Sequence, residues 1–271
     1  FNSNEFNFEF IKLNKPNLLS SNYLPNFTAG LTFFIAVAAT NLFHQGNWQR
    51  VYAAKNNDVL KKSLFFSFII IIPVVFLMGF CGLVAVSQNS NVIPDLAFFS
   101  LLLREQTLAL SIIILVLAIS LTVSSIDTLI NAISSLIIVD GNKVIKFKGN
   151  YLKMSKQIII LLSLITFYVA SKGLSILYLF LLADLFCCAF VVTVFYSFYN
   201  KLNEKTAYVS IIIGLVAGFL MFPFPDFSKS LLVGVFFPTD LFSPFIAQSL
   251  LFLSFLIATF LPAIILKIKF R

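Results

Sequence analysis

The chain has 271 residues, of which 59% are hydrophobic and only 11% are charged, and its formal net charge is +8 at pH 7. Its mean hydropathy of +0.98 excludes a water-soluble globular protein, because so few polar residues cannot cover a solvated surface. The composition therefore predicts an integral membrane protein in contact with a lipid bilayer.

Seven long apolar runs, each bounded by polar or charged residues, are candidate membrane spans. A helix of about 20 residues crosses a hydrocarbon core about 30 Å thick. Strands of a membrane barrel would be half as long and would alternate in polarity. We therefore expect an all-α polytopic protein of about seven transmembrane helices. The expected spans are Phe27–His44, Leu64–Val86, Thr107–Val139, Ser155–Ser171, Leu174–Tyr199, Thr206–Phe222 and Ile246–Leu266.

The segments outside these runs carry weaker signals. Residues 1–26 begin with "FNSNEFNFEF" and contain two prolines, which is typical of an extracellular loop or surface helix that precedes a transmembrane domain at 27–271. Between the second and third runs, "IPDLAFFSLLLREQ" (Ile93–Gln106) is apolar at helical spacing but too short to cross, so it predicts an interfacial helix.

The lysines and arginines fall mainly on one side when the loops are numbered alternately. By the positive-inside rule this side is cytoplasmic, with the N-terminal segment outside and the C-terminus inside the cell inner (plasma) membrane. The basic excess is then a topology signal, and no nucleic-acid partner is expected. The cytoplasmic group is Arg50, Lys55, Lys61, Lys62, Lys143, Lys146, Lys148, Lys153, Lys156, Lys201, Lys205, Lys267, Lys269 and Arg271.

The third run contains "SLTVSSIDTLIN", in which an acid and several hydroxyls interrupt apolar sequence. At 3.6 residues per turn the polar residues share one helix face. An ionised Asp127 inside a span is costly, so it needs a partner, water or a bound cation. The stripe consists of Ser120, Ser124, Asp127, Thr128, Asn131 and Ser135.

A cation is the partner that this stripe favours, because no Lys, Arg or His occupies the central part of any span. Hydroxyl and carboxylate oxygens suit a hard ion, so Ser124, Ser125 and Asp127 are the predicted Na⁺ ligands. The alternative is that the hydroxyls allow close helix packing and that Asp127 hydrogen-bonds a neighbour.

The first span ends in "NLFHQGNWQRVYAAK" (Asn41–Lys55), where Trp48 and Arg50 are typical of an interfacial anchor. Thr40, Asn41, His44 and Gln45 come before the run has fully crossed, and we expect Gly46 to help break the helix. An interrupted span with polar groups beside its break indicates a substrate site in transporters, so Thr40, Asn41 and Gln45 are the predicted substrate-binding residues.

Asp184, in "LLADLFCC", is the other intramembrane acid. It could pair with the polar stripe, join a proton relay or hydrogen-bond in a helix interface. Cys81, Cys187 and Cys188 lie within spans without metal-ligand spacing, and we expect them to act as small apolar residues. Apart from Na⁺ as a coupling ion, no cofactor is expected.

Three segments resemble the sodium:solute symporter family, which includes carriers of sugars, proline, urea and anions. "VSSIDT" is similar to the family's sodium-site pair, with Asp140 matching an acid that follows that helix. "HQGNWQRVYAAK" resembles a family segment ending in Ala-Ala-Lys, and "PDLAFFSLLL" resembles the short extracellular helix before the sodium-site helix. The three occur in the family's order.

The resemblance implies that Ser124 and Ser125 bind the main Na⁺, and that Asp127 replaces a hydroxyl residue associated with a second cation. Thr40 and Asn41 match the family's substrate gate without the aromatic pair of sugar carriers. The implied function is sodium-coupled symport of a small polar organic solute, such as a urea-, proline- or amino-acid-like one.

The family fold has two inverted repeats of five helices. The chain maps onto the second repeat plus two peripheral helices, so it is expected to be a C-terminal fragment whose partner, the N-terminal half, is missing.

Two other classes remain as alternatives. A complete seven-helix membrane receptor shares the expected topology. An intramembrane hydrolase would need Ser124, His44 and Asp127 within about 2.6–3.2 Å of one another. His44 lies near the cytoplasmic edge, whereas Ser124 lies deeper, so we expect no enzyme.

Overall fold

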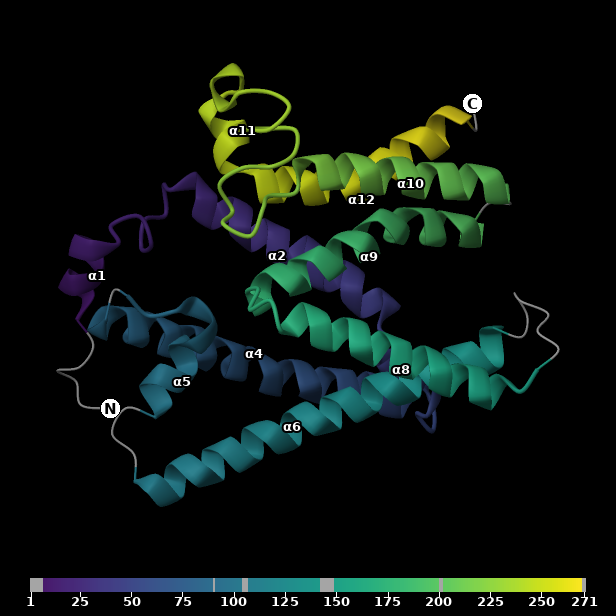
Figure 1. The fold of residues 1–271 in the computed structure, drawn as a ribbon, viewed down its shortest axis with the longest axis horizontal. Coiled ribbons are helices and arrows are strands. Elements are labelled where there is room, and N and C mark those ends of the chain that lie inside the picture. The colour runs from purple at the N-terminus through teal and green to yellow at the C-terminus, as the bar shows by residue number, and fades with distance from the viewer. Residues whose placement is uncertain (1–6, 90, 104–106, 142–148, 200–201, 270–271) are drawn as a thin grey trace. The chain divides into compact units, whose positions relative to one another are not determined.

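The computed structural model describes residues 7–89, 91–103, 107–141, 149–199 and 202–269 (Figure 1). In that part of the chain every regular element is a helix, and seven helices are long and apolar enough to cross a membrane. The expectation of an all-α, multi-pass membrane protein is therefore confirmed. The helices fall into two compact units, which are described in turn.

Unit 1 comprises the described residues of Phe1–Asn14 and His44–Gly173. Within it α5 packs on α4, α3 packs on α6, and α8 contacts both α6 and the π-helical turn η2 that continues α6. Its elements are α1 (Phe8–Asn14), α3 (Gln45–Tyr52), α4 (Asn57–Gln88), η1 (Pro94–Leu96), α5 (Ala97–Leu102), α6 (Leu108–Ser135), η2 (Leu136–Asp140) and α8 (Tyr151–Ala170).

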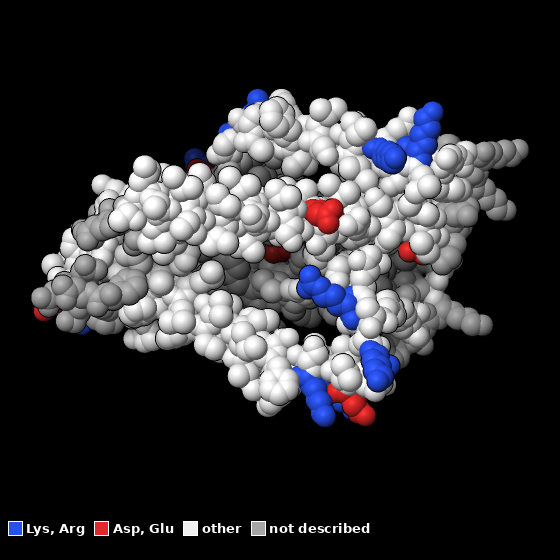
Figure 2. All heavy atoms as spheres, turned by 90° about the horizontal axis from the view of Figure 1, so that it is seen from below, with Lys and Arg blue, Asp and Glu red and all other residues white. Residues whose placement is uncertain are grey.

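The long helices of unit 1 expose apolar side chains on nearly all sides. In the most apolar stretch of α6 no residue is buried, and Leu121, Val123 and Ile126 are all more than half exposed. A helix that is apolar all round belongs in lipid or against other membrane helices. In Figure 2 much of the surface shown is free of charged side chains, which gather mainly in the right half of the view, and such uncharged surface is expected where a protein faces lipid.

Asparagine side chains start several of the helices. The Oδ1 of Asn56 accepts from the backbone N–H of Val59 at 2.8 Å at the start of α4. Asn150 and Asn203 cap α8 and α10 in the same way. These caps satisfy donors that have no partner within the helix, and they locate helix ends that the apolar pattern alone cannot locate. Thus α4 begins seven residues before the expected Leu64.

Unit 2 comprises Lys15–Phe43 and the described residues of Leu174–Arg271. In it α9 and α12 contact each other, and both contact α2 and α10, so four long helices form one bundle (Figure 1). Its elements are α2 (Leu24–Phe43), α9 (Ile176–Tyr199), α10 (Glu204–Met221), η3 (Thr239–Leu241), α11 (Pro244–Gln248) and α12 (Leu250–Lys269).

The core of unit 2 combines small residues, which bring helix backbones together, with larger ones that fill the remaining space. Without a hydrophobic force between helices in lipid, such close packing is what holds membrane helices together. The buried core residues are Ala36, Ala39, Leu181, Leu185, Cys188, Ala189, Phe222, Phe255 and Ala258.

The helices α10 and α12 pack tightly against each other in this bundle. Ser210, Gly214 and Gly218 recur at every fourth residue of α10 and are all buried. A Cβ added at Gly214 would lie 2.5 Å from Cγ of Pro262 and 3.1 Å from the carbonyl oxygen of Ala258. Pro262 cannot donate to that carbonyl, four residues earlier in α12, so the carbonyl is left facing α10. Glycine at 214 is therefore required for the contact.

The segment between α10 and α11 is compact without being helical. Backbone hydrogen bonds from Phe224 to Lys229 (2.8 Å) and from Leu232 to Leu220 (2.8 Å) fold it back on the end of α10. Phe227 ends a turn with its N–H donating to Phe224 at 2.8 Å, and it has a φ of 56°, which is strained for a residue with a side chain.

Two helix breaks differ from expectation. The first falls at His44, which has extended backbone, and Gly46 lies inside α3 instead of breaking the helix. The absence of a Cβ at Gly46 makes room for the His44 ring, since an added Cβ would lie 2.9 Å from His44 Cε1. The second break, at Ser249, divides the expected span Ile246–Leu266 into α11 and α12.

The expected interfacial helix is shorter than its apolar pattern suggested. Within Ile93–Gln106 the helical residues are η1 and α5, which end at Leu102, while residues 104–106 lie outside the described part of the chain. The lysines expected in the loop at 143–148 also lie outside it.

Candidate functional site

The polar stripe of α6 is exposed over most of its length. Asp127 is exposed, and its one hydrogen bond among the described residues is to the side-chain amide of Asn131, which donates to Oδ2 at 3.4 Å. No Lys or Arg in the described part of the chain forms an ion pair with it. An acid within a candidate span and with so weak a partner is open to a cation or to water.

The hydroxyls beside Asp127 keep oxygen lone pairs free. Ser125 donates to the carbonyl of Leu121 at 2.9 Å, and Thr128 donates to the carbonyl of Ser124 at 3.0 Å. A hydroxyl that donates its proton still has acceptor capacity, which a cation can use. The Ser124 hydroxyl has no hydrogen-bond partner among the described residues. One helix face thus carries a carboxylate and hydroxyl oxygens of the kind that Na⁺ prefers.

The C-terminal half of the stripe packs on α3. The Gln49 side chain donates from Nε2 to Oγ of Ser135 at 3.1 Å. Nearby, Gly46 lies against the His44 ring and the Thr128 side chain. A Cβ added at Gly46 would lie 3.4 Å from the methyl carbon of Thr128. The Nδ1 atom of His44 is buried without a hydrogen-bond partner in the described structure. The segment after the helix break therefore covers one end of the stripe.

Of the predicted substrate-binding residues, Gln45 begins α3 in unit 1, and Thr40 and Asn41 lie near the end of α2 in unit 2. Asn41 donates from Nδ2 to the carbonyl of Val37 at 2.8 Å. The Thr40 hydroxyl donates to Oδ1 of Asp184 on α9 at 2.5 Å. That these residues contact a substrate stays a prediction.

Asp184 is a buried acid in the interface of α2 and α9, with only 7% of its surface exposed. Thr40 is its one hydrogen-bond partner among the described residues. One turn further along α9, the Cys188 thiol donates to the carbonyl of Ile35 at 3.9 Å, so polar contacts join the two helices at successive turns. Of the roles open from the sequence, the structure shows the hydrogen bond in a helix interface.

Two features of unit 2 had not been expected from the sequence. The small-residue spacing of Ser210, Gly214 and Gly218 was a readable signal for close helix packing. Around Ser249 the signal was weak, because the polar pair Gln248–Ser249 interrupts an otherwise apolar run by only two residues. In the structure Ser249 lies at the break before α12, lines a cavity, and has a buried hydroxyl with no partner among the described residues.

Comparison of the chain with protein-family models, with curated proteins and with solved structures finds no match in any of the three. The fold and the polar groups of α2, α6 and α9 therefore have to be interpreted on their own. They show an all-α, multi-pass membrane protein with seven candidate membrane-spanning helices in its described part.

Proposed function

We propose that the protein takes part in sodium-coupled symport of a small polar organic solute across the cell inner (plasma) membrane. The observation that carries the proposal is the face of α6 on which Asp127 lies beside Ser124 and Ser125. This acid has no basic partner in the described structure, and the neighbouring oxygens have free lone pairs. Na⁺ bound there would neutralise the acid and replace water with protein oxygens.

The helix break at His44 supports a transporter over a rigid pore or a receptor. α2 ends at Phe43 and α3 begins at Gln45. Transporters of several folds place substrate at such interruptions, where backbone groups lose their helical partners. Binding of Na⁺ and of solute would each favour the same arrangement of these helices, and linkage would then make each raise the affinity for the other.

The resemblance of the three ordered motifs to sodium:solute symporters supports the same proposal. In that scheme a preceding repeat supplies a second broken helix whose carbonyls complete the sodium site. We therefore propose that the α6 face is one side of the site and that an N-terminal half supplies the other. The orientation expected from the Lys and Arg distribution, with the C-terminus cytoplasmic, belongs to the same proposal.

The test is uptake of labelled urea and proline by cells expressing the complete gene, with and without an inward Na⁺ gradient. We expect uptake of at least one of the two solutes only with the gradient. Asp127→Asn and Ser124→Ala should each raise the Na⁺ concentration for half-maximal uptake by roughly ten-fold or more, because each removes a charge or an oxygen from the ion.

Thr122→Ala is the matched control for these variants. Thr122 is exposed on the opposite face of α6 and donates to the carbonyl of Ala118 at 2.8 Å. Removal of the Thr122 hydroxyl should leave the Na⁺ dependence of uptake unchanged. The variant therefore shows whether loss of any hydroxyl from α6 damages the helix. Equal uptake without a gradient would contradict sodium coupling. An unchanged Na⁺ dependence in Asp127→Asn would contradict the assignment of the site.

A further inference from the structure

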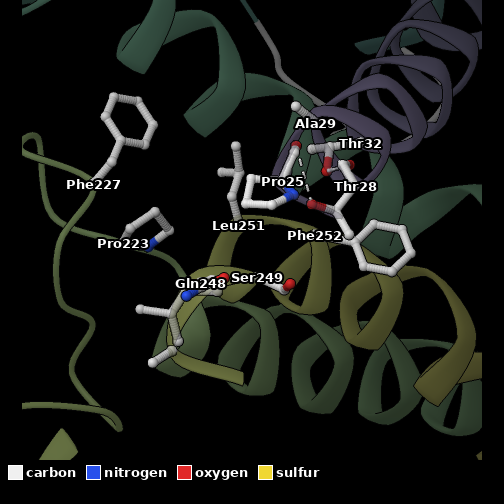
Figure 3. A pocket seen from close by; sticks show the side chains of 12 residues that line it. Pro25, Thr28, Ala29, Thr32, Pro223, Phe227, Gln248, Ser249, Leu251 and Phe252 are labelled. Atoms are coloured by element: carbon white, nitrogen blue, oxygen red, sulfur yellow. Dashed lines mark hydrogen bonds between the residues drawn. The ribbon is translucent and has the colours of Figure 1, made fainter. Parts of the chain in front are cut away.

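A cavity of about 200 Å³ lies within unit 2, between the start of α2 and the break that precedes α12 (Figure 3). Pro25, Thr28 and Thr32 line it from α2, and Gln248 and Ser249 line it from the break. None of these residues belongs to the α6 stripe or to the Thr40–Asp184 pair. The cavity is therefore separate from the polar groups on which the proposed symport rests.

Ser249 provides the strongest sign that something binds here. It is only 2% exposed, and its Oγ atom is buried without a hydrogen-bond partner in the described structure. A buried hydroxyl left unpaired is unfavourable, and native structures rarely keep one. Because Ser249 lines the cavity, rotation of its side chain about χ1 would turn the hydroxyl toward a molecule in the cavity, which can then supply the missing partner.

The other polar groups of the cavity define what that molecule must offer. Thr28 donates to the carbonyl of Pro25 at 3.2 Å, and Thr32 donates to the carbonyl of Thr28 at 2.7 Å. Both hydroxyls have thus used their protons, and because Thr32 has no exposed surface, only Thr28, which is 5% exposed, can offer lone pairs to a ligand. A ligand therefore needs a donor for Thr28 and an acceptor for the Ser249 hydroxyl, and a primary amide has both.

The remaining walls are apolar. They comprise Pro223, Phe227, Leu251 and Phe252, together with alanine and leucine side chains, and none of the described residues that line the cavity is charged. An ion would therefore lose its hydration without gaining a counter-charge. The volume suits a compound of roughly six to nine heavy atoms, because a cavity of about 150 Å³ holds benzene.

The wall over the cavity is held in a strained conformation. Phe227 has a φ of 56°, which is uncommon for a residue with a Cβ. Its ring packs edge-on against Tyr178, with centroids 6.0 Å apart. Backbone strain of this kind persists where the surroundings fix it, and it is often found beside ligands.

We propose that this cavity is a binding site for a small uncharged molecule with an amide-like head and a short apolar body, held by Ser249 and the lone pairs of Thr28. The site is independent of Na⁺ and of the α6 face. Binding can therefore be measured on the purified chain without any gradient, and the outcome does not depend on whether symport is found.

The experiment uses trifluoroacetamide as the probe and follows its ¹⁹F signal with the full chain reconstituted in phosphatidylcholine nanodiscs. We expect saturable broadening of the signal, and about five-fold weaker binding to Ser249→Ala, the effect of losing one neutral hydrogen bond. Trifluoroacetate, which has nearly the same shape but a negative charge, should not bind.

Ser254→Ala is the matched control. Ser254 lies on α12, just after the break, is fully buried, and donates to the carbonyl of Leu251 at 2.7 Å without lining the cavity. It should bind the probe like the unaltered chain. A second readout applies if Ser249→Ala does not fold. In Ser249→Cys the new thiol should be alkylated by uncharged iodoacetamide, and mass spectrometry of the peptide that contains residue 249 measures the extent of alkylation. Propionamide should slow this alkylation by occupying the cavity.

Three results would overturn the proposal. Equal binding of trifluoroacetate would exclude a site for uncharged molecules. Equal binding to the unaltered chain and to Ser249→Ala, with no protection of Ser249→Cys by propionamide, would mean that the probe only partitions into lipid. Absence of saturable binding in nanodiscs would mean that lipid chains or water fill the cavity.

Discussion

Replacing Gly214 by alanine is expected to lower the free energy of unfolding by about 1–2 kcal/mol, although alanine is the better helix former by about 1 kcal/mol. The added Cβ would lie 2.5 Å from Cγ and 2.8 Å from Cδ of Pro262, and a proline ring cannot turn away. The helices α10 and α12 would have to separate, and they form the most extensive helix contact of unit 2. The measurement is the loss of far-UV circular dichroism of the purified chain as sodium dodecyl sulfate is titrated into mild detergent.

Two further variants make this result specific. Gly30→Ala, in α2 of the same unit, is the matched control because nothing lies within 4 Å of its added Cβ, and it should be neutral or slightly stabilising. Pro262→Ala removes the two ring atoms, so Gly214→Ala should lose much of its effect in that background. Equal destabilisation with and without Pro262 would show that the helices do not meet here as described.

The spans could be predicted from sequence because their signal is local. A run of apolar residues long enough to cross the bilayer forms a helix wherever it lies in the fold, since lipid offers no partner to an unpaired backbone group. The third span, expected at Thr107–Val139, is observed at Leu108–Asp140. The polar stripe of α6 likewise follows from a repeat of 3.6 residues per turn.

Contacts between helices could not be predicted in this way. Asp184 was recognisable as an intramembrane acid, but its partner Thr40 lies 144 residues away in the sequence. The break at Ser249 was hard to predict because the polar pair Gln248–Ser249 interrupts the apolar run by only two residues. The start of α11 has a clearer local signal, because Ser243 accepts from the N–H of Ile246 at 3.4 Å as its N-cap. The glycines of α10 indicate that some helix packs closely there, but the periodicity of the sequence does not show which helix that is. The partner is determined by tertiary packing.

The hydrogen bond between α2 and α9 gives the second large effect. Thr40→Val changes the shape of the side chain very little but removes the only donor to Asp184 in the described structure. An acceptor that is 93% buried and left unpaired costs about 1–3 kcal/mol, so we expect a loss of stability in that range. Thr40→Ser keeps the hydroxyl and is the control. The same detergent titration measures both variants.

Asp184 should tolerate change better than Thr40, because the two partners differ in what they can do alone. In Asp184→Asn the amide oxygen still accepts from Thr40, so stability should change little. In Asp184→Leu the Thr40 hydroxyl can turn to the carbonyl four residues before it in α2, as Thr32 does at 2.7 Å. The carboxyl has no such second partner, so removing its donor is the more damaging change.

The double variant Thr40→Val with Asp184→Leu tests this reasoning most directly. Replacing both members of a buried pair with apolar groups of similar shape leaves nothing unpaired and can be nearly neutral. We therefore expect the double variant to be more stable than Thr40→Val alone. If Thr40→Val were equally destabilising with Asp and with Leu at 184, its effect would come from packing, and the hydrogen bond between α2 and α9 would contribute nothing measurable to the stability of unit 2.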